Sequence, residues 1–276
     1  MNFTQRLSQI IREQDSLLCI GLDPDIRRIP AKMANSADPL YNFCSEIIER
    51  TLHTAAAYKL NLAFFESEGS KGWAALEKLI QIIPDTVLTI ADAKRGDIGT
   101  SSEMYARAIL DKLNFDAVTV NPYMGKDSVE PFLRQSDKGA FVLCLTSNPG
   151  NRDFQYFRDG DGAKTLHSHV AKTVLGWNQN ENCGLVVGAT QPEELQSIRK
   201  AAPELPFLIP GVGTQGGDLK AAVLNGTDAS GGLALFNVSR GIIYKSSERD
   251  FAEAAKREAE TLRDQINEFR KMKARS

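Results

Sequence analysis

Cysteine and histidine are both scarce in this sequence of 276 residues, which has four of the first and three of the second. No two cysteines form a Cys-x-x-Cys pair, and three of the four lie in or beside apolar segments predicted as strands. Zinc sites and disulfide-rich secreted domains use paired cysteines, so we predict buried free thiols in a cytoplasmic protein. The histidines fall at no predicted strand end, and we expect no metal site. These residues are Cys19, Cys44, Cys144 and Cys183, and His53, His167 and His169.

A long apolar run and a surplus of positive charge are also missing. No apolar stretch is long enough to span a bilayer, so we expect no membrane partner. The 33 Lys and Arg residues face 35 Asp and Glu residues, and the net charge of -2 creates no global positive field for nucleic acid. The opening segment MNFTQRLSQIIREQD lacks the apolar run and cleavage site of a signal peptide. An anionic ligand would therefore have to be held by local groups.

Short apolar runs rich in β-forming residues alternate with amphipathic stretches along the whole chain. We predict strands at Leu17–Leu22, Ala55–Lys59, Val87–Ala91, Ala117–Val120, Ala140–Leu145, Gly184–Val187, Phe207–Ile209 and Ala229–Leu235. We predict helices at Phe3–Glu13, Leu40–Leu52, Leu76–Ile83, Ser102–Leu113, Asp127–Gln135, Thr165–Asn178, Gln191–Ala201, Gly217–Asn225 and Phe251–Phe269.

The predicted strands are apolar on both faces, which is typical of a parallel sheet covered on both sides. Eight strand–helix units close most simply as a barrel. We therefore predict a single-domain (β/α)8 TIM barrel over residues 1–276, with an extra N-terminal helix at Phe3–Glu13. An open doubly wound sheet is the alternative.

The most charged motif is ADAKRGDIGTSSEMYA, Ala91 to Ala106, at the end of the third predicted strand. Alternate residues of a strand share a face, so Asp92 and Lys94 should project together into the barrel mouth, with Asp97 just beyond in the loop. Three close charges of alternating sign are costly to desolvate, so they indicate either a structural ion-pair cluster or a working site. The spacing alone leaves both interpretations open.

Two further charged residues belong to neighbouring strands. Lys59 lies in YKLNLAFFE at the second predicted strand and should be beside Asp92, because strands adjacent in sequence are usually neighbours. Asp23 ends LLCIGLD at the carboxyl end of the first strand. A lone lysine here is commonly a rim residue, and a lone aspartate a turn residue. Their shared position beside Asp92 favours the functional interpretation.

Glycine-rich segments follow the seventh and eighth predicted strands, where barrels commonly bind phosphate. PGVGTQGGD offers backbone N–H groups and the amide of Gln215, and FNVSRG offers the bidentate fork of Arg240. After the fifth strand, LTSNPG places Ser147 where it could contact a polar ring edge, although SNPG is also an ordinary turn sequence. Together these segments predict a phosphate-containing ligand.

The whole predicted barrel resembles the orotidine 5′-phosphate decarboxylase family, particularly the longer of its bacterial branches. The likeness lies in LLCIGLDPD, YKLNLAFFESEG, ADAKRGDIG, TVNPYMGKD, LTSNPG, PGVGTQGGD and SRGIIY. The resemblance implies decarboxylation of orotidine 5′-phosphate to UMP in de novo pyrimidine biosynthesis, without a cofactor and with Lys94 as the proton donor to C6. Such chemistry relies on preorganised electrostatics, because the carbanion at C6 has no obvious electron sink.

The resemblance also implies a role for each site residue. The family's Lys-Asp-Lys-Asp array maps onto Lys59, Asp92, Lys94 and Asp97, with Asp97 reaching into the neighbouring subunit's site of a homodimer. The implied substrate contacts are Asp23 and Lys59 to the ribose, Ser147 to the pyrimidine, and Gln215 and Arg240 to the phosphate. Ser101 stands where the branch usually has threonine and Leu60 where it often has proline, so the ring or ribose contact at Ser101 is the one that this departure affects.

Three other functions are compatible with parts of this pattern. A sugar-phosphate decarboxylase or synthase on a related barrel would share the DxKxxD element but use a divalent metal, and KRGDI with SNPG argues against it. A Schiff-base aldolase would use Lys59 or Lys94 as nucleophile, but flanking aspartates keep a lysine protonated. A non-catalytic barrel would bind a phosphate ligand and release no CO2.

Overall fold

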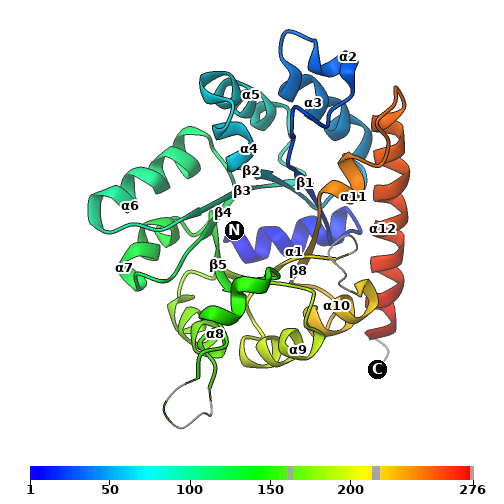
Figure 1. Ribbon diagram of the computed structural model, residues 1–276. Coiled ribbons are helices and arrows are strands. Elements are labelled where there is room, and N and C mark those ends of the chain that lie inside the picture. The colour runs from blue at the N-terminus through cyan, green and yellow to red at the C-terminus, as the bar shows by residue number, and fades with distance from the viewer. Residues whose placement is uncertain (159, 161–163, 213–217, 274–276) are drawn as a thin grey trace.

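The chain forms a closed barrel of eight parallel strands, shown in Figure 1. The computed structural model describes residues 1–158, 160, 164–212 and 218–273. Each strand pairs with the next in sequence, and β8 returns to β1, so the predicted (β/α)8 barrel is confirmed and the open sheet is wrong. The strands are β1 (Leu18–Leu22), β2 (Ala57–Asn61), β3 (Leu88–Arg95), β4 (Ala117–Val120), β5 (Gly139–Leu145), β6 (Cys183–Val187), β7 (Phe207–Pro210) and β8 (Ala234–Val238).

Helices surround the barrel and connect successive strands (Figure 1). The α-helices are α1 (Phe3–Glu13), α2 (Ala31–Ala34), α3 (Pro39–Thr51), α4 (Leu62–Glu66), α5 (Gly69–Ile82), α6 (Gly99–Ala106), α7 (Lys126–Val129), α8 (Leu166–Trp177), α9 (Pro192–Ala201), α10 (Leu219–Gly226), α11 (Arg240–Ile243) and α12 (Phe251–Lys273). A π-helix, η1 (Arg107–Lys112), continues α6, and short 3-10 helices form η2 (Glu130–Leu133) and η3 (Pro149–Asp153). No helix within the described ranges is long and apolar enough to cross a membrane.

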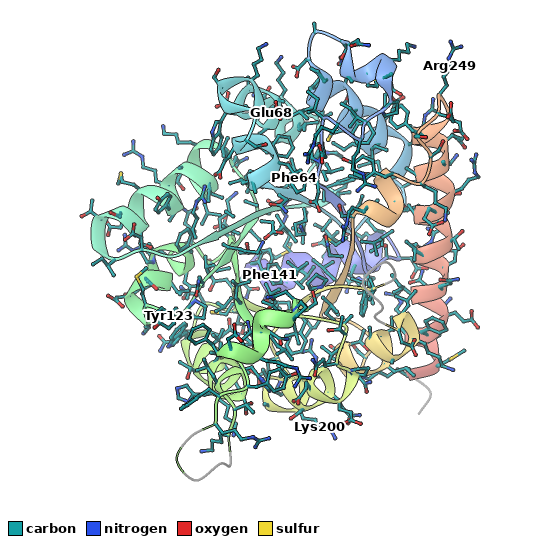
Figure 2. The ribbon with its side chains drawn as sticks, viewed as in Figure 1. Phe64, Glu68, Tyr123, Phe141, Lys200 and Arg249 are labelled. Atoms are coloured by element: carbon teal, nitrogen blue, oxygen red, sulfur yellow. The ribbon has the colours of Figure 1, made fainter. Side chains whose placement is uncertain are left out.

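The strands are apolar because both of their faces are covered. Every residue of β1, β4, β6 and β8 is buried, with side chains either inside the barrel or under the helices. The interior contains large rings such as Phe141 of β5, labelled near the centre of Figure 2. The four cysteines are buried and free, as predicted.

Helix α1 closes the amino-terminal end of the barrel, as its position across the ring of strands in Figure 1 shows. The buried ring of Phe3 meets the ring of Phe141 edge-on, with 5.8 Å between the centroids. Arg6 forms an ion pair of 2.5 Å with Asp116, which precedes β4. The predicted extra N-terminal helix is therefore confirmed, and it serves as the floor of the barrel.

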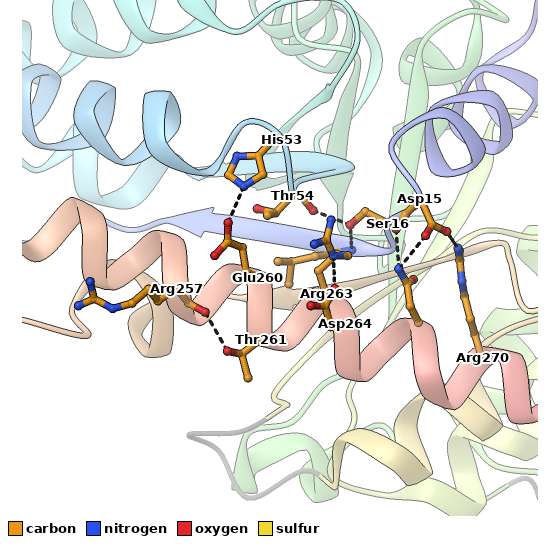
Figure 3. Close-up of polar contacts among 12 residues, drawn as sticks. Asp15, Ser16, His53, Thr54, Arg257, Glu260, Thr261, Arg263, Asp264 and Arg270 are labelled. Carbon is orange, nitrogen blue, oxygen red and sulfur yellow. Dashed lines mark hydrogen bonds and ion pairs between the residues drawn. The ribbon is translucent and has the colours of Figure 1, made fainter.

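Helix α12 ties the end of the described chain to the same amino-terminal side, as Figure 3 shows. Asp15, between α1 and β1, accepts hydrogen bonds from Asn267 (2.7 Å to its carbonyl oxygen) and from Arg270. Further along α12, Glu260 lies 2.9 Å from Nε2 of His53, which follows α3. These contacts hold α12 against the barrel through polar groups as well as through its apolar face.

Several strand boundaries differ from the prediction, and two of the differences have identifiable reasons. The strand predicted at Ala229–Leu235 is wrong at its start, because Asp228 accepts hydrogen bonds from the N–H groups of Ser230 (2.9 Å) and Gly232 (2.7 Å) and holds a turn there. Strand β3 continues four residues beyond the predicted end at Ala91, to Arg95, and it does so through a register shift against β4. That shift lies at the centre of the site described next.

Candidate active site

A cavity of about 230 Å³ opens at the carboxyl ends of β1, β7 and β8. Barrel enzymes place their active sites at this end of the strands. Asp23 and Arg240, two of the predicted substrate-binding residues, are in its wall, and Phe64 of α4 (labelled in Figure 2) covers one side. The lining residues are Asp23, Phe64, Pro210, Gly211, Val212, Asn237, Val238, Ser239 and Arg240. Gln215 lies outside the described residues.

Four charged side chains gather beside this cavity as the sequence predicted. Asp92 bridges two lysines: its Oδ2 lies 2.7 Å from Nζ of Lys59 and its Oδ1 lies 2.6 Å from Nζ of Lys94. Lys59 is also 3.9 Å from Oδ1 of Asp23, so the four form one chain of alternating charge. The side chains of Lys59 and Asp92 are only 5% and 11% exposed, whereas that of Lys94 is 52% exposed. Lys94 is therefore the member that can reach a ligand from the open side.

Lys59 is buried inside β2, not on the rim where a lone strand-end lysine would lie. Burial by itself would lower the pKa of Lys59, but the Asp92 and Asp23 carboxylates outweigh it and raise the pKa above the ordinary value. Burial would raise the pKa of Asp92, and the two lysines outweigh it and lower the pKa well below its usual range. Both groups are therefore charged throughout the neutral pH range.

The backbone of Lys94 has a left-handed conformation, with φ of 48°, which is rare for a residue other than glycine. Such a conformation costs on the order of 1–3 kcal/mol and persists only where surrounding contacts hold it. Here the N–H of Lys94 donates to Oγ1 of Thr119 (3.0 Å), and the same hydroxyl donates to Oδ1 of Asp92 (3.0 Å). We did not predict Thr119 as a site residue. The signal that could have identified it is its polar side chain in a strand that is otherwise apolar.

Among the described residues, Asp97 forms no hydrogen bond or ion pair with Lys94 of its own chain. It is half-buried in the loop after β3, and its Oδ1 accepts a hydrogen bond from the N–H of Ile98 (2.8 Å). Among the described residues, Asp97 forms no ion pair. Ser101, on the first turn of α6, is exposed. If either residue serves the site, it does so from the surface of α6 and its preceding loop.

The wall of the cavity contains two buried oxygens without a hydrogen-bond partner among the described residues, Oδ1 of Asp23 and Oγ of Ser239. A buried oxygen without a hydrogen bond costs about 1–3 kcal/mol, and among those residues Oδ1 of Asp23 has only its 3.9 Å ion pair with Lys59. The guanidinium of Arg240 is exposed at the start of α11. This wall therefore combines a cation with unsatisfied polar groups, as a site for a polar anionic ligand would.

Tyr244 is a second residue that sequence analysis did not identify. Its hydroxyl donates to the carbonyl oxygen of Asp23 (3.1 Å) and accepts from the N–H of Asp25 (2.6 Å), while its ring stacks on Phe43. Burial raises the pKa of Tyr244 to about 12, so the hydroxyl keeps its proton. Tyr244 thereby fixes the loop that presents Asp23. No local signal reveals it, because its partners are more than two hundred residues away in the sequence.

Ser147 is half-buried after β5, in a loop held by its own polar side chains. The amide oxygen of Gln155 accepts from the N–H of Thr146 (2.8 Å), and Asn151 donates to the carbonyl oxygen of Thr146 (2.6 Å). A Cβ on Gly188, after β6, would approach within 3.1 Å of Ser147, so glycine leaves room for the loop there. In the described part of the chain, no three His, Cys, Asp or Glu side chains are grouped so that they could hold a metal ion.

Known proteins resemble the chain along nearly its full length. The model of the orotidine 5′-phosphate decarboxylase / HUMPS family matches residues 16–257. An orotidine 5′-phosphate decarboxylase of Dehalococcoides mccartyi is 51% identical over 273 residues, which cover 98% of this chain and 99% of that one.

Two solved structures share the fold. A Toxoplasma gondii protein, provisionally named an orotidine-monophosphate decarboxylase, has a TM-score of 0.91 at 39% identity, covering 100% of this chain and 99% of that chain. The Leishmania donovani OMP decarboxylase has a TM-score of 0.85 at 42% identity, covering 98% and 99%. Barrel, charged cluster and relatives agree, and the chain belongs to the orotidine 5′-phosphate decarboxylase / HUMPS family.

Proposed function

We propose that this protein decarboxylates orotidine 5′-phosphate to UMP without a metal or organic cofactor, and that Lys94 donates the proton to C6. The observation that carries the proposal is the position of Asp92, whose two carboxylate oxygens lie 2.7 Å and 2.6 Å from the ammonium groups of Lys59 and Lys94. The chain belongs to a family whose named relatives are decarboxylases, and this membership supports the same activity.

In the proposed reaction, the bond between C6 and the carboxylate breaks and the electron pair stays on C6 as CO2 leaves. The ammonium of Lys94 stabilises this developing negative charge and then transfers its proton to C6. Because the side chain of Lys94 is 52% exposed, the resulting neutral amine can regain a proton from solvent. Atoms and charge then balance without any further reactant.

Several charges must act together for this chemistry. Enzymes lower barriers by ~8–23 kcal/mol, whereas one preorganised donor contributes about 2.7–4 kcal/mol. Asp92 supplies this preorganisation because it fixes the ammonium groups of both lysines before substrate arrives. Lys59 cannot itself serve as the proton source so readily, because its side chain is only 5% exposed and two carboxylates raise its pKa.

The remaining predicted residues would bind the substrate. Asp23 and Lys59 would hold the ribose, Ser147 and Ser101 the ring or ribose edge, and Arg240 with Gln215 the phosphate. The cavity supports part of this assignment, because Asp23 and Arg240 both line it. Phosphate binding at Arg240 would contribute to turnover as well as to affinity, since binding energy far from the reacting carbon can be used in the transition state.

We further propose a homodimer in which Asp97 completes the site of the partner subunit. The loop that holds Asp97 and the neighbouring surface expose several large apolar side chains, and a cluster of this kind marks an interaction surface. Tyr123, labelled at the edge of the molecule in Figure 2, is 85% exposed. The exposed group consists of Ile98, Met104, Tyr105, Tyr123 and Met124.

Mixed dimers test the proposed sharing of Asp97. Lys94→Ala and Asp97→Ala homodimers should each be nearly inactive. After unfolding and refolding together in equal amounts, half of the dimers are mixed, and each mixed dimer has one site with both residues intact. About a quarter of the wild-type sites should therefore be restored. If Asp97 acts within its own chain, the mixture stays as inactive as its parents.

The overall activity is tested by adding purified protein to orotidine 5′-phosphate in the presence of EDTA. Orotidylate absorbance should fall, with one UMP and one CO2 formed for each substrate consumed. A metal-dependent sugar-phosphate synthase would be inactivated by EDTA and would leave orotidylate unchanged. A Schiff-base enzyme would be trapped covalently by borohydride with its substrate, and a non-catalytic binding protein would bind nucleotide without releasing CO2.

A further inference from the structure

The register between β3 and β4 changes at the site. Ala91 pairs with Val118 and Arg95 pairs with Val120, so three residues of β3 stand opposite Thr119 alone. A bulge of this kind leaves backbone groups of the longer strand without their usual partners across the ladder. The side chain of the single opposing residue can then replace the missing ladder contacts.

Thr119, which is 1% exposed, replaces these ladder contacts with its hydroxyl. The N–H of Lys94 donates to Oγ1 of Thr119 over 3.0 Å, and Oγ1 of Thr119 donates to Oδ1 of Asp92 over 3.0 Å. A threonine hydroxyl has one proton, and a carboxylate can only accept, so the proton must point to Asp92 and a lone pair to Lys94. The direction of both bonds is therefore fixed.

We propose that Thr119 is a positioning residue for the proton transfer from Lys94. Its hydroxyl holds the left-handed backbone of Lys94, with φ of 48°, and also holds the carboxylate oxygen that lies 2.6 Å from Nζ of Lys94. One buried oxygen atom, Oγ1 of Thr119, thus holds the backbone of Lys94 directly and its ammonium group through Asp92. Thr119 does not itself touch the substrate in this scheme, and the inference rests on the function proposed above.

The same pair of strands contains a matched control at its other end. Thr89 of β3 donates from Oγ1 to Oδ2 of Asp116 (3.0 Å) and accepts from the N–H of Asp116 (3.0 Å). Thr89 is buried like Thr119, and its hydroxyl also joins a carboxylate to a backbone N–H. It lies at the amino end of the barrel, away from the cavity and from Lys94.

The experiment compares Thr119→Val, Thr119→Ser and Thr89→Val in steady-state decarboxylation of orotidine 5′-phosphate, with thermal unfolding measured for each. Thr119→Val keeps the shape and removes the hydroxyl, so kcat should fall about 10- to 100-fold, because small misplacements of a catalytic group have effects of this size. KM should stay within about threefold, since the phosphate and ribose contacts are on other strands. Thr119→Ser should restore most of kcat, and Thr89→Val should lower Tm while leaving kcat unchanged.

The inference is overturned if Thr119→Val keeps a kcat within about twofold of the wild-type value, or if Thr119→Ser is as impaired as Thr119→Val. If Thr119→Val does not accumulate as folded protein, Thr119→Cys takes its place, because a thiol is similar in size to a hydroxyl but is a weak donor. An undiminished kcat in Thr119→Cys contradicts the inference equally. A wild-type protein that releases no CO2 contradicts the proposed function, whereas an active wild type with an unaffected Thr119 variant contradicts this inference alone.

Discussion

Strands β3 and β4 join a threonine to an aspartate at each of their ends, and the two junctions are completed differently. At the amino end, Asp116 accepts hydrogen bonds from the N–H and the hydroxyl of Thr89 and an ion pair from Arg6 of α1. At the carboxyl end, Asp92 accepts from the hydroxyl of Thr119 and from two lysines. Arg6 belongs to the helix that covers the amino end and is 27% exposed, whereas the side chain of Lys94 is 52% exposed.

The difference indicates how the barrel separates stability from reactivity. At the amino end, buried charges are fully used by the fold: Arg199, for example, donates to carbonyl oxygens that include those of Leu205 (2.7 Å) and Leu233 (2.9 Å), and burial lowers its pKa to about 10. At the carboxyl end, the backbone of Lys94 is strained, and oxygens of Asp23 and Ser239 have no hydrogen-bond partner within the described residues. Left-handed residues and buried oxygens without a hydrogen bond also occur at the amino end, for example at Leu233 and Asn182. The carboxyl end differs because its strained residue is a half-exposed lysine and its unbonded oxygens are in a cavity wall, as in a functional site.

Replacing the aspartate at each junction should give the largest effects and tests whether the two junctions have different roles. Asp92→Asn removes the charge that fixes both lysines and should lower kcat by at least about a thousandfold, since orientation and charge are lost together. Asp116→Asn should instead lower the free energy of unfolding by about 2–4 kcal/mol, because a buried charged network loses a partner. Steady-state kinetics and chemical denaturation of both variants measure the two effects. Equal losses of kcat in the two variants would contradict the proposed division.

Arg240 tests whether the exposed cation of the cavity wall binds phosphate. Arg240→Ala should raise KM and lower kcat/KM by about a hundredfold or more, because charge-assisted hydrogen bonds to the phosphate are lost. The free energy of unfolding should hardly change, since the guanidinium is exposed. Arg249→Ala, at the exposed arginine labelled at the edge of Figure 2, is the control and should leave both constants unaltered. An unchanged KM in Arg240→Ala would mean that phosphate binds elsewhere.

A smaller effect, on the pH dependence of stability, is expected from His167, a structural residue at the carboxyl end. His167 is buried between the carbonyl oxygen of Gln155 (3.1 Å) and Glu194 (3.3 Å), so it fixes the loop after β5 as a structural group. Burial lowers its pKa below the ordinary 6.5, although Glu194 opposes the shift. Between the folded pKa and 6.5 the unfolded chain therefore binds more protons, and stability decreases as the pH falls through this range.

The measurement is Tm at about pH 7.5 and about pH 5.5, on either side of the ordinary histidine pKa. Wild-type protein should lose more stability on acidification than His167→Gln, which has no titrating ring. A pH dependence of Tm that is identical in the two proteins would show that His167 is not the group responsible. His53, whose ring is half exposed in its contact with Glu260, offers the control variant His53→Gln.

The fold was predictable because its signals are local and repeated. Each buried parallel strand is a short apolar run, and β4 has the predicted bounds, Ala117–Val120. The contact between Asp92 and Lys94 was also predicted, but simple alternation along a flat strand is not its basis. A register shift and a left-handed residue bring the two together, and neither can be read from composition or period.

The residues that sequence analysis missed depend on distant partners. Thr119 acts on Lys94 across a strand pair, and Tyr244 fixes the loop of Asp23 from the far end of the chain. Strand β8 was predicted to start too early because the side chain of Asp228 holds a turn that outweighs the apolar pattern. Contacts of this kind depend on tertiary structure, which periodicity and spacing do not contain.

The central claim is that Lys94 supplies the proton at an electrostatically prepared site, and Lys94→Ala tests it most directly. The variant should bind UMP within about threefold of wild-type affinity, because the phosphate and ribose groups remain, while kcat falls by at least about ten-thousandfold. Lys78→Ala is the matched control, since Lys78 is also half exposed and lies 2.8 Å from an aspartate, Asp38, and its kcat should not change. Turnover of Lys94→Ala within about tenfold of the wild type would contradict the claim.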